Sequence, residues 1–409
     1  MALRCRATSQ SLQDGEVLRI RQGDLPTAGP LRRTLGLATL AREQQRIMPA
    51  TVDQLRRYAL ARSLFKPTTL RRAIAKLGFV QADPLRAPAR AQDLTLRHRV
   101  LDYRAGDLER RYPKLPIEED FFVNYGFLGK QHHALMHPRT PRTLWPKSRW
   151  AQADAVLAFV RKRGLAHPRE VDAHFNHGKV RNWFGGTSNA STELLDGMHY
   201  RGLLRVACRD GGTRVYGARE PWPEHGGRDA CQARMDALVD LVVAAYAPLP
   251  APSLRQLVNA LRTAAPQWAD DRNRALVHAK SRLGHSEVQG IDWYWPVEEN
   301  PSSRRWQVAE RTLRLLAPFD PVVWDRRRFE VFWGWSYRFE AYTPAAKRKM
   351  GHYALPMLWG EQMIGWCNLA VRDSHLVVDP GFVVKRPAGE IFRQALDDEL
   401  QRMSDFLGL

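Results

Sequence analysis

The chain has 409 residues, of which 44% are hydrophobic and 26% charged, a balance typical of globular proteins rather than fibrous or disordered ones. Its formal net charge of +20 favours a polyanionic partner, most simply nucleic acid, with a membrane surface as the other polyanion it suits. No run approaches the roughly 20 apolar residues of a membrane span, and the four cysteines lie singly, so a reducing cytoplasm is expected rather than a membrane or a disulfide framework.

The N-terminal part of the chain divides at Met48. Residues 1–47 are polar and weakly periodic, so we expect a loose extension or a segment ahead of the true start. A capping-box spacing at residues 51–54 opens a helix, and a second helix should stop at Gly78. We interpret residues 48–148 as a first winged-helix-like unit.

An amide and a carboxylate, Gln81 and Asp83, follow this second helix, directly before Pro84. Proline disfavours a helical conformation in the residue before it, so the segment should be extended and both side chains should point the same way. An amide beside an ionised carboxylate can orient one water for hydrolysis of a bond with a good leaving group. Asp-Pro is also a common turn or helix-start pair, and on the residues alone capping is the commoner role for Asp83.

Four further polar residues, Gln92, Asp93, Arg97 and His98, follow closely enough to help build a pocket around this pair. Polarity on a helix surface is their commoner role.

Residues 149–220 show the clearest local topology. Three predicted helices end near Gly164, Phe175 and Gly202, and two strands then flank Asp210-Gly211-Gly212, a strong hairpin signal. Helices followed by a hairpin are the order of a winged helix-turn-helix, whose third helix commonly enters a DNA groove. A similar order recurs over residues 233–310, which we predict to be a third such unit.

The character changes to β structure in residues 311–409. Strands are predicted over 313–316, 337–342, 352–359 and 363–371, and a final helix over 388–406. The expected fold class is therefore α+β, mainly α, with tandem winged helix-turn-helix units and a C-terminal antiparallel β region. Tryptophans crowd this region, and core packing is the expected role of most of them.

Metal and nucleotide sites are not predicted. His132, His133 and His137 include an i, i+4 pair, but no carboxylate or thiolate at ligand spacing accompanies them. The glycine pairs lack the strand-turn-helix context of a phosphate-binding loop. No cofactor is therefore expected.

Two short basic clusters occupy residues 326–328 and 347–349. A charge run is usually a solvated face, but the overall positive charge favours phosphate binding, above all for Lys347, Arg348 and Lys349. Arg326 is the candidate from the other cluster.

Residues 81–94, 316–326 and 342–356 resemble three separated motifs of the winged-helix DNA glycosylases of the AlkZ/YcaQ type. The similarity extends from about residue 50 to the C-terminus. It implies tandem winged helices around a concave DNA-binding channel, removal of alkylated purines and, in the YcaQ-like branch, unhooking of interstrand crosslinks. Where the AlkZ branch has Gln-x-Gln, this chain has Gln81-Ala82-Asp83, as in the YcaQ-like branch. Many members carry Trp-x-His-Glu where this chain has residues 124–128.

The resemblance assigns catalysis to Gln81 and Asp83, and Arg86 and Arg90 in the same motif become candidate DNA contacts. We therefore predict a monomeric, monofunctional DNA glycosylase, cytoplasmic and nucleoid-associated, that acts without a cofactor on double-stranded DNA with alkylated or crosslinked purines. The alternative is a non-catalytic winged-helix DNA-binding protein, either a transcription regulator or a damage-recognition factor. A nuclease ranks last, because the sequence offers no cluster of metal-binding carboxylates.

Overall fold

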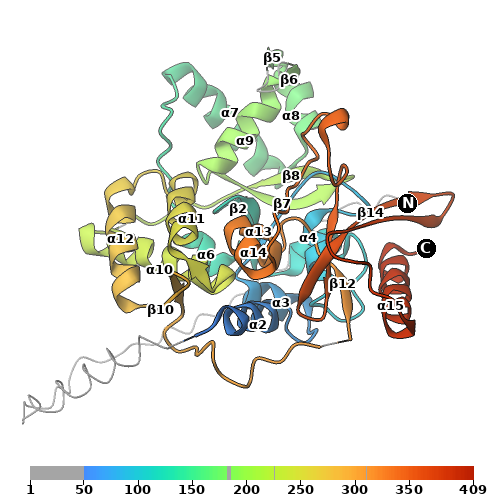
Figure 1. Cartoon of the computed structure of the whole chain (residues 1–409). Helices are drawn as coiled ribbons and strands as arrows, with labels where there is room; N and C mark the ends of the chain where they lie inside the picture. The colour runs from blue at the N-terminus through green and yellow to red at the C-terminus, as the bar shows by residue number, and fades with distance from the viewer. Residues whose placement is uncertain (1–49, 182–185, 225, 310) are drawn as a thin grey trace, which may run out of the picture.

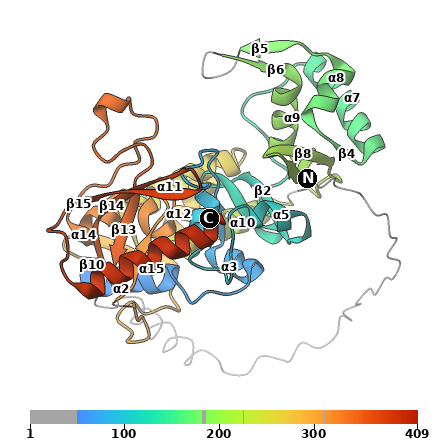
Figure 2. The same ribbon diagram turned by 90° about the vertical axis from the view of Figure 1, so that its right-hand side faces the viewer.

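The computed structural model describes residues 50–181, 186–224, 226–309 and 311–409, so the predicted extension lies outside it. Helices and antiparallel sheets alternate along the chain, with the segment around α7–α9 standing apart from the C-terminal sheet (Figures 1 and 2). No helix in the described residues is both long and apolar enough to cross a membrane.

The first segment contains short helices and one small sheet of order β1-β3-β2. The capping box predicted at Thr51 is present, and Gly78 ends α3 with a φ of 71°, a conformation that glycine adopts at little cost. Its elements are α2 (Val52–Ser63), α3 (Leu70–Leu77), β1 (Phe79–Gln81), α4 (Ala91–Leu96), α5 (Asp107–Arg111), η1 (Tyr112–Lys114), β2 (Ile117–Phe121), β3 (Tyr125–Gly129) and α6 (Lys130–Ala134).

The second segment has the three helices and the hairpin predicted for it. Its main sheet has the order β4-β8-β7, and a small hairpin, β5-β6, is inserted between the second and third helices. The elements are α7 (Lys147–Arg163), β4 (Leu165–Ala166), α8 (Pro168–Phe175), β5 (Lys179–Arg181), β6 (Thr187–Asn189), α9 (Ala190–Tyr200), β7 (Leu204–Asp210) and β8 (Thr213–Ala218).

The third segment follows the same order with longer helices. It ends in a hairpin, because Gln289 and Gly290 both adopt positive φ values, 54° and 71°, and reverse the chain. Its elements are α10 (Arg228–Tyr246), β9 (Leu249–Pro250), α11 (Ala251–Ala264), α12 (Ala269–Arg282), β10 (Gly284–Val288) and β11 (Ile291–Trp295).

The C-terminal segment is built on a sheet of order β12-β13-β14-β15, against which the last helix packs. The hairpin of the two long strands projects beyond the body of the molecule (Figure 1). The elements are β12 (Leu313–Leu315), α13 (Pro321–Trp324), α14 (Arg326–Trp333), η2 (Ala345–Lys347), β13 (Leu355–Trp359), β14 (Gln362–Arg372), β15 (His375–Phe382) and α15 (Glu390–Leu407).

The strand predicted at residues 337–342 is wrong. The chain from 335 to 353 is an irregular loop around η2, held by side chains rather than by a strand ladder. Buried Glu340 accepts hydrogen bonds from the backbone of Lys349 and Met350 through Oε2, at 2.8 and 2.7 Å, and the Tyr337 hydroxyl donates to Ala354. These polar contacts take the place of the strand pairing that the sequence predicted.

Three hydrophobic cores cross the boundaries predicted from the sequence. Leu55 and Tyr58 of α2 belong to the core built mainly from residues 235–295, whereas Leu60 belongs to the one around α13 and α14. In β1, Phe79 packs into the core built mainly from residues 235–295, whereas Val80 packs into a third core, which is shared with the second and C-terminal segments. Successive strand residues face opposite sides, so β1 is clamped where the segments meet.

Candidate active site

Gln81 is the last residue of β1, and its backbone is held against β3. It pairs with Gly126 of β3, where an added Cβ would lie 2.3 Å from the carbonyl oxygen of Val80, so only glycine permits the close approach. The next amide, that of Ala82, donates to the carbonyl of Tyr125 at 2.9 Å. The Gln81 side chain is 6% exposed, and its Oε1 is buried without a hydrogen-bond partner among the described residues. This acceptor is therefore available to a water or a ligand.

Asp83 is partly buried and shapes the loop that follows. Its Oδ1 accepts a hydrogen bond from the amide of Leu85 at 2.9 Å. One carboxylate oxygen of Asp83 therefore caps the turn, as the sequence allowed. No helix starts at Pro84; α4 begins at Ala91. Burial raises the pKa of Asp83, and the Leu85 amide partly offsets this.

One cavity of about 690 Å³ brings the two side chains together. Its walls come from the loop after β1, the β2–β3 turn, the α8–α9 region, the β7–β8 hairpin and the loops flanking α13 and α14. It adjoins a second cavity of about 460 Å³, and Gln81, Asn124 and Phe319 line both.

The three arginines in this first cavity are all paired with carboxylates. Arg90 contacts Glu109, Arg209 contacts Glu119, and Arg214 lies 3.1 Å from Asp196. The β7–β8 hairpin carries two of these guanidinium groups, and it is tied to β2, which it contacts, through the Arg209–Glu119 ion pair. Arg90 was predicted as a DNA contact, and its charge is compensated inside the protein.

Aromatic side chains also line this cavity. Phe319, Phe339 and Tyr342 contact the cavity, and Tyr342 is 73% exposed. Behind them, Tyr353 packs edge to face on Phe339 with ring centroids 5.2 Å apart. The Tyr353 hydroxyl is buried without a hydrogen-bond partner in the described chain; burial and then the Asp83 carboxylate raise its pKa.

The four polar residues after the pair are not surface residues. The Gln92 side chain lines the cavity and accepts from the Asp83 amide at 3.3 Å. Asp93 binds the Tyr103 hydroxyl at 2.6 Å, Arg97 contacts Glu399, and His98 binds the carbonyl of Leu315, so these three connect α4 to its surroundings. Helix-surface polarity is therefore wrong for all four, and only Gln92 belongs to the site.

The basic clusters behave differently from each other. Lys347 and Lys349 are exposed, and Arg348 donates to the carbonyl of Thr343 at 2.8 Å. Arg326 is exposed and lines the second cavity. Its neighbour Arg328 is 1% exposed and binds backbone carbonyls, including those of Tyr246 and Pro321, so that part of the cluster is structural.

Arg86 is exposed at the β7–β8 turn. A Cβ added at Gly212 in that turn would lie 2.5 Å from Nη2 of Arg90 and 3.7 Å from Nη2 of Arg86, so both guanidinium groups abut the hairpin tip.

The histidines have a carboxylate neighbour that sequence spacing did not reveal. Asp120 of β2 places Oδ2 3.0 Å from Nε2 of both His133 and His137, and in the described residues these three form the one group with metal-ligand spacing. Since a carboxylate only accepts, both Nε2 atoms donate to it, and Arg139 donates to Oδ1 at 3.1 Å. Both Nδ1 atoms lack the partner that normally orients a metal-binding histidine. The group therefore fits a charge-compensated hydrogen-bond network better than a metal site.

This network has strongly shifted pKa values. Burial opposes ionisation of Asp120, but Arg139 and the two histidines together hold its pKa well below its usual range. Burial lowers the pKa of His137 to about 3, so the ring is neutral at physiological pH.

A family model for AlkZ-like DNA glycosylases matches residues 74–406, a span that includes the cavity walls described above. The chain belongs to this family. The structure of the DNA glycosylase AlkZ from Streptomyces sahachiroi is similar to this chain, with a TM-score of 0.59 and 15% identity over 88% of this chain and 98% of that one. This likeness extends to the fold of nearly the whole AlkZ chain.

As an AlkZ-like DNA glycosylase, the protein acts on DNA, and the family resemblance seen in the sequence is confirmed. Sequence analysis did not predict several residues of the cavity, including Arg209, Arg214 and Tyr125. Asn124 and Tyr125 lie in the β2–β3 hairpin, which the acidic composition of β2 disguised. Tyr342 lies in the segment 337–342, which was predicted to be a strand.

Proposed function

We propose that this glycosylase hydrolyses the N-glycosidic bond of alkylated purines in double-stranded DNA, with Asp83 and Gln81 as the catalytic residues. The observation that supports this most is the unpartnered, buried Gln81 Oε1 lining the same cavity as the Asp83 carboxylate. An acceptor without a partner in a polar cavity is a site for water.

The chemistry needs few groups because ring-nitrogen alkylation makes the purine a cationic leaving group. The glycosidic bond breaks with its electron pair passing to the base, which becomes neutral, and the sugar passes through an oxocarbenium-like state that the Asp83 anion stabilises. A water molecule that donates a hydrogen bond to Gln81 Oε1 attacks the sugar carbon and loses a proton to Asp83. The products are the free alkylated base and an abasic site, as expected of a monofunctional enzyme.

The walls of the cavity suit such a base. Phe319, Phe339 and Tyr342 offer ring faces to a cationic purine, while the arginines there are neutralised by carboxylates and repel it less. Behind these rings, the Tyr353 hydroxyl is near enough to Asp83 for that carboxylate to raise its pKa, so we include it as a third polar group of the site.

The wider fold supports the rest of the proposal. The order helix, strand, two helices and hairpin in the second and third segments fits tandem winged helices, and the adjoining cavities fit a concave channel. A crosslinked base cannot leave the stack freely, so an open channel also suits unhooking of interstrand crosslinks. A protein that itself encloses DNA has no need of a second copy, and we propose a monomer.

The test is release of base from duplexes carrying an N7- or N3-alkylated purine or a nitrogen-mustard crosslink. Gln81→Ala and Asp83→Asn should abolish most of the release, whereas Asp397→Asn, at an exposed position on α15, should not change it. Binding without release by the unmodified protein would favour the non-catalytic DNA-binding alternative.

A further inference from the structure

Two further cavities continue from the candidate active site along helix α11. The cavity that holds Arg326 shares Gln256 and Arg327 with one of about 750 Å³, and this one shares Arg262 with another of about 340 Å³. Four adjoining hollows thus lead from Gln81 to the far end of α11.

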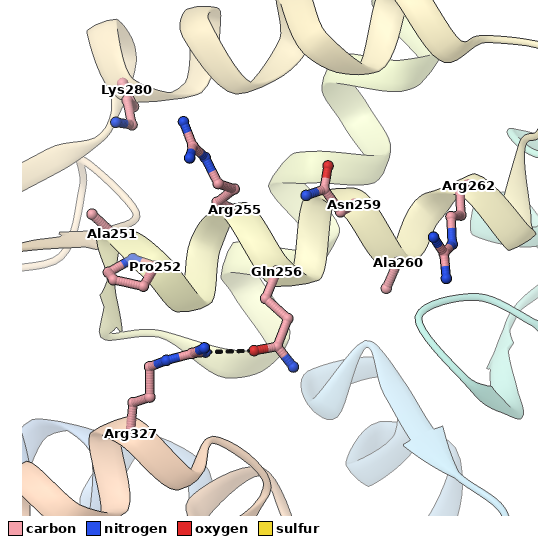
Figure 3. A pocket seen from close by; sticks show the side chains of 9 residues that line it. All are labelled: Ala251, Pro252, Arg255, Gln256, Asn259, Ala260, Arg262, Lys280 and Arg327. Atoms are coloured by element: carbon pink, nitrogen blue, oxygen red, sulfur yellow. Dashed lines mark hydrogen bonds between the residues drawn. The ribbon is translucent and has the colours of Figure 1, made fainter.

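The cations on this path are unpaired, unlike those of the active-site cavity. Arg255 and Arg262 of α11 and Lys280 of α12 are exposed, and none forms an ion pair with any described residue. Figure 3 shows Lys280 on one side of α11 and Arg327, from α14, on the other. The Arg327 guanidinium donates to Gln256 at 2.6 Å, which keeps its charge uncompensated. Among the residues that the structure describes, no carboxylate lines the 750 or the 340 Å³ cavity.

A further arginine, Arg272, lies close enough to Arg142 and Arg262 for their charges to disfavour its own. Burial and then the charges of Arg142 and Arg262 lower the pKa of Arg272, whose Nε and Nη1 are buried without partners in the described residues. A folded protein that gathers like charges without counter-ions gains free energy when a polyanion binds there.

The lining also indicates which part of a nucleic acid fits. Of the described residues, those lining the 750 Å³ cavity are cations, the amides Gln256 and Asn259, and three small apolar residues, with no aromatic side chain. Stacking platforms for unpaired bases are therefore absent from it, whereas guanidinium, ammonium and amide donors suit phosphates. Arg255 and Arg262 are seven residues apart, about 10.5 Å along the helix, which is the rise of about three phosphates on one strand of a duplex.

We propose that the α11 trough, lined by Arg255, Arg262, Lys280 and Arg327, binds the sugar-phosphate backbone of one strand of the undamaged duplex on a single side of the lesion. This inference rests on the proposed function, which places the lesion at Gln81 and Asp83. The trough leads away from Gln81 in one direction, so it would contact the duplex on one side of that lesion. It holds the substrate in register and reads no sequence.

The first experiment measures binding to undamaged duplex as a function of salt. The triple variant Arg255→Gln, Arg262→Gln, Lys280→Gln should lower the salt slope by roughly 0.9 per cation removed, and weaken binding on the order of 10²-fold at 0.1 M salt. The matched control, Lys66→Gln, Arg71→Gln, Arg72→Gln, removes the same charge from exposed positions outside all four cavities. It should lower the slope far less. If the two triple variants lose affinity and salt slope equally, or if the trough variant loses neither, the proposal that the trough binds DNA is wrong. This result does not depend on whether any base is released.

The second experiment lengthens the duplex on one side of an alkylated purine at a time and follows base release below saturation. Extension on one side only should raise the rate, and the trough variant should lose that gain while keeping the rate on the shortest duplex. If extension on either side raises the rate of base release equally, or if the trough variant keeps the increase, the trough does not bind the duplex on a single side of the lesion. Absence of any release in the unmodified protein defeats the proposed function and, with it, the assignment of the trough to a lesion flank.

Discussion

The substitution Asp83→Asn tests the proposed chemistry because structure predicts opposite effects on rate and on stability. Asparagine has the same shape and keeps an oxygen for the Leu85 amide, so the turn should survive. Burial raises the pKa of Asp83, which means that the fold disfavours the charge and a neutral amide costs less to bury. The free energy of unfolding should therefore stay within about 0.5 kcal/mol or rise slightly.

The rate should fall steeply in the same variant. Loss of a base and of the anion beside a developing cation typically costs about 10²–10⁴-fold, and a factor of 10³ corresponds to about 4 kcal/mol in the barrier. The measurement is single-turnover base release at saturating protein, with urea unfolding of both proteins. In the unmodified enzyme the rate should rise with pH through the Asp83 pKa, above its ordinary value of 3.8, and this limb should vanish in Asp83→Asn. Retained activity, or loss of activity matched by unfolding, would contradict the assignment.

Three other outcomes are expected. Tyr353→Phe removes a hydroxyl without a partner in the described chain, so stability should not fall, whereas base release should slow and its acid limb should move; unchanged kinetics would remove Tyr353 from the site. Arg139→Met leaves Asp120 charged and buried, and should cost about 3–5 kcal/mol in urea unfolding, against at most about 1 kcal/mol for Arg163→Met, which breaks an exposed pair. In the folded protein His137 stays neutral down to about pH 3, whereas in the unfolded chain it titrates near 6.5. The free energy of unfolding should therefore fall by about 1.4 kcal/mol per pH unit below 6.5 from this group alone. A urea midpoint that is constant from pH 7 to 5 would show that His137 takes up a proton within the folded protein.

Local signals in the sequence were sufficient for much of the secondary structure. The capping box at Thr51, the stop at Gly78 and the hairpin at Asp210-Gly211-Gly212 depend on neighbours within a few residues, and all are present. The motif around Gln81 and Asp83, with the two that follow it, was enough to predict the family.

Partners far apart in the chain decided what the sequence could not. Arg90 and Arg255 are the same residue type in the sequence, but within the described part of the chain only Arg90 forms an ion pair, with Glu109. The histidines gained Asp120 because β2 folds against α6, and the segment at 337–342 became a loop because Glu340 binds amides nine and ten residues away. Charge compensation and hydrogen bonding depend on distance in space. The trough and the unpartnered Gln81 acceptor therefore became visible only in the tertiary structure.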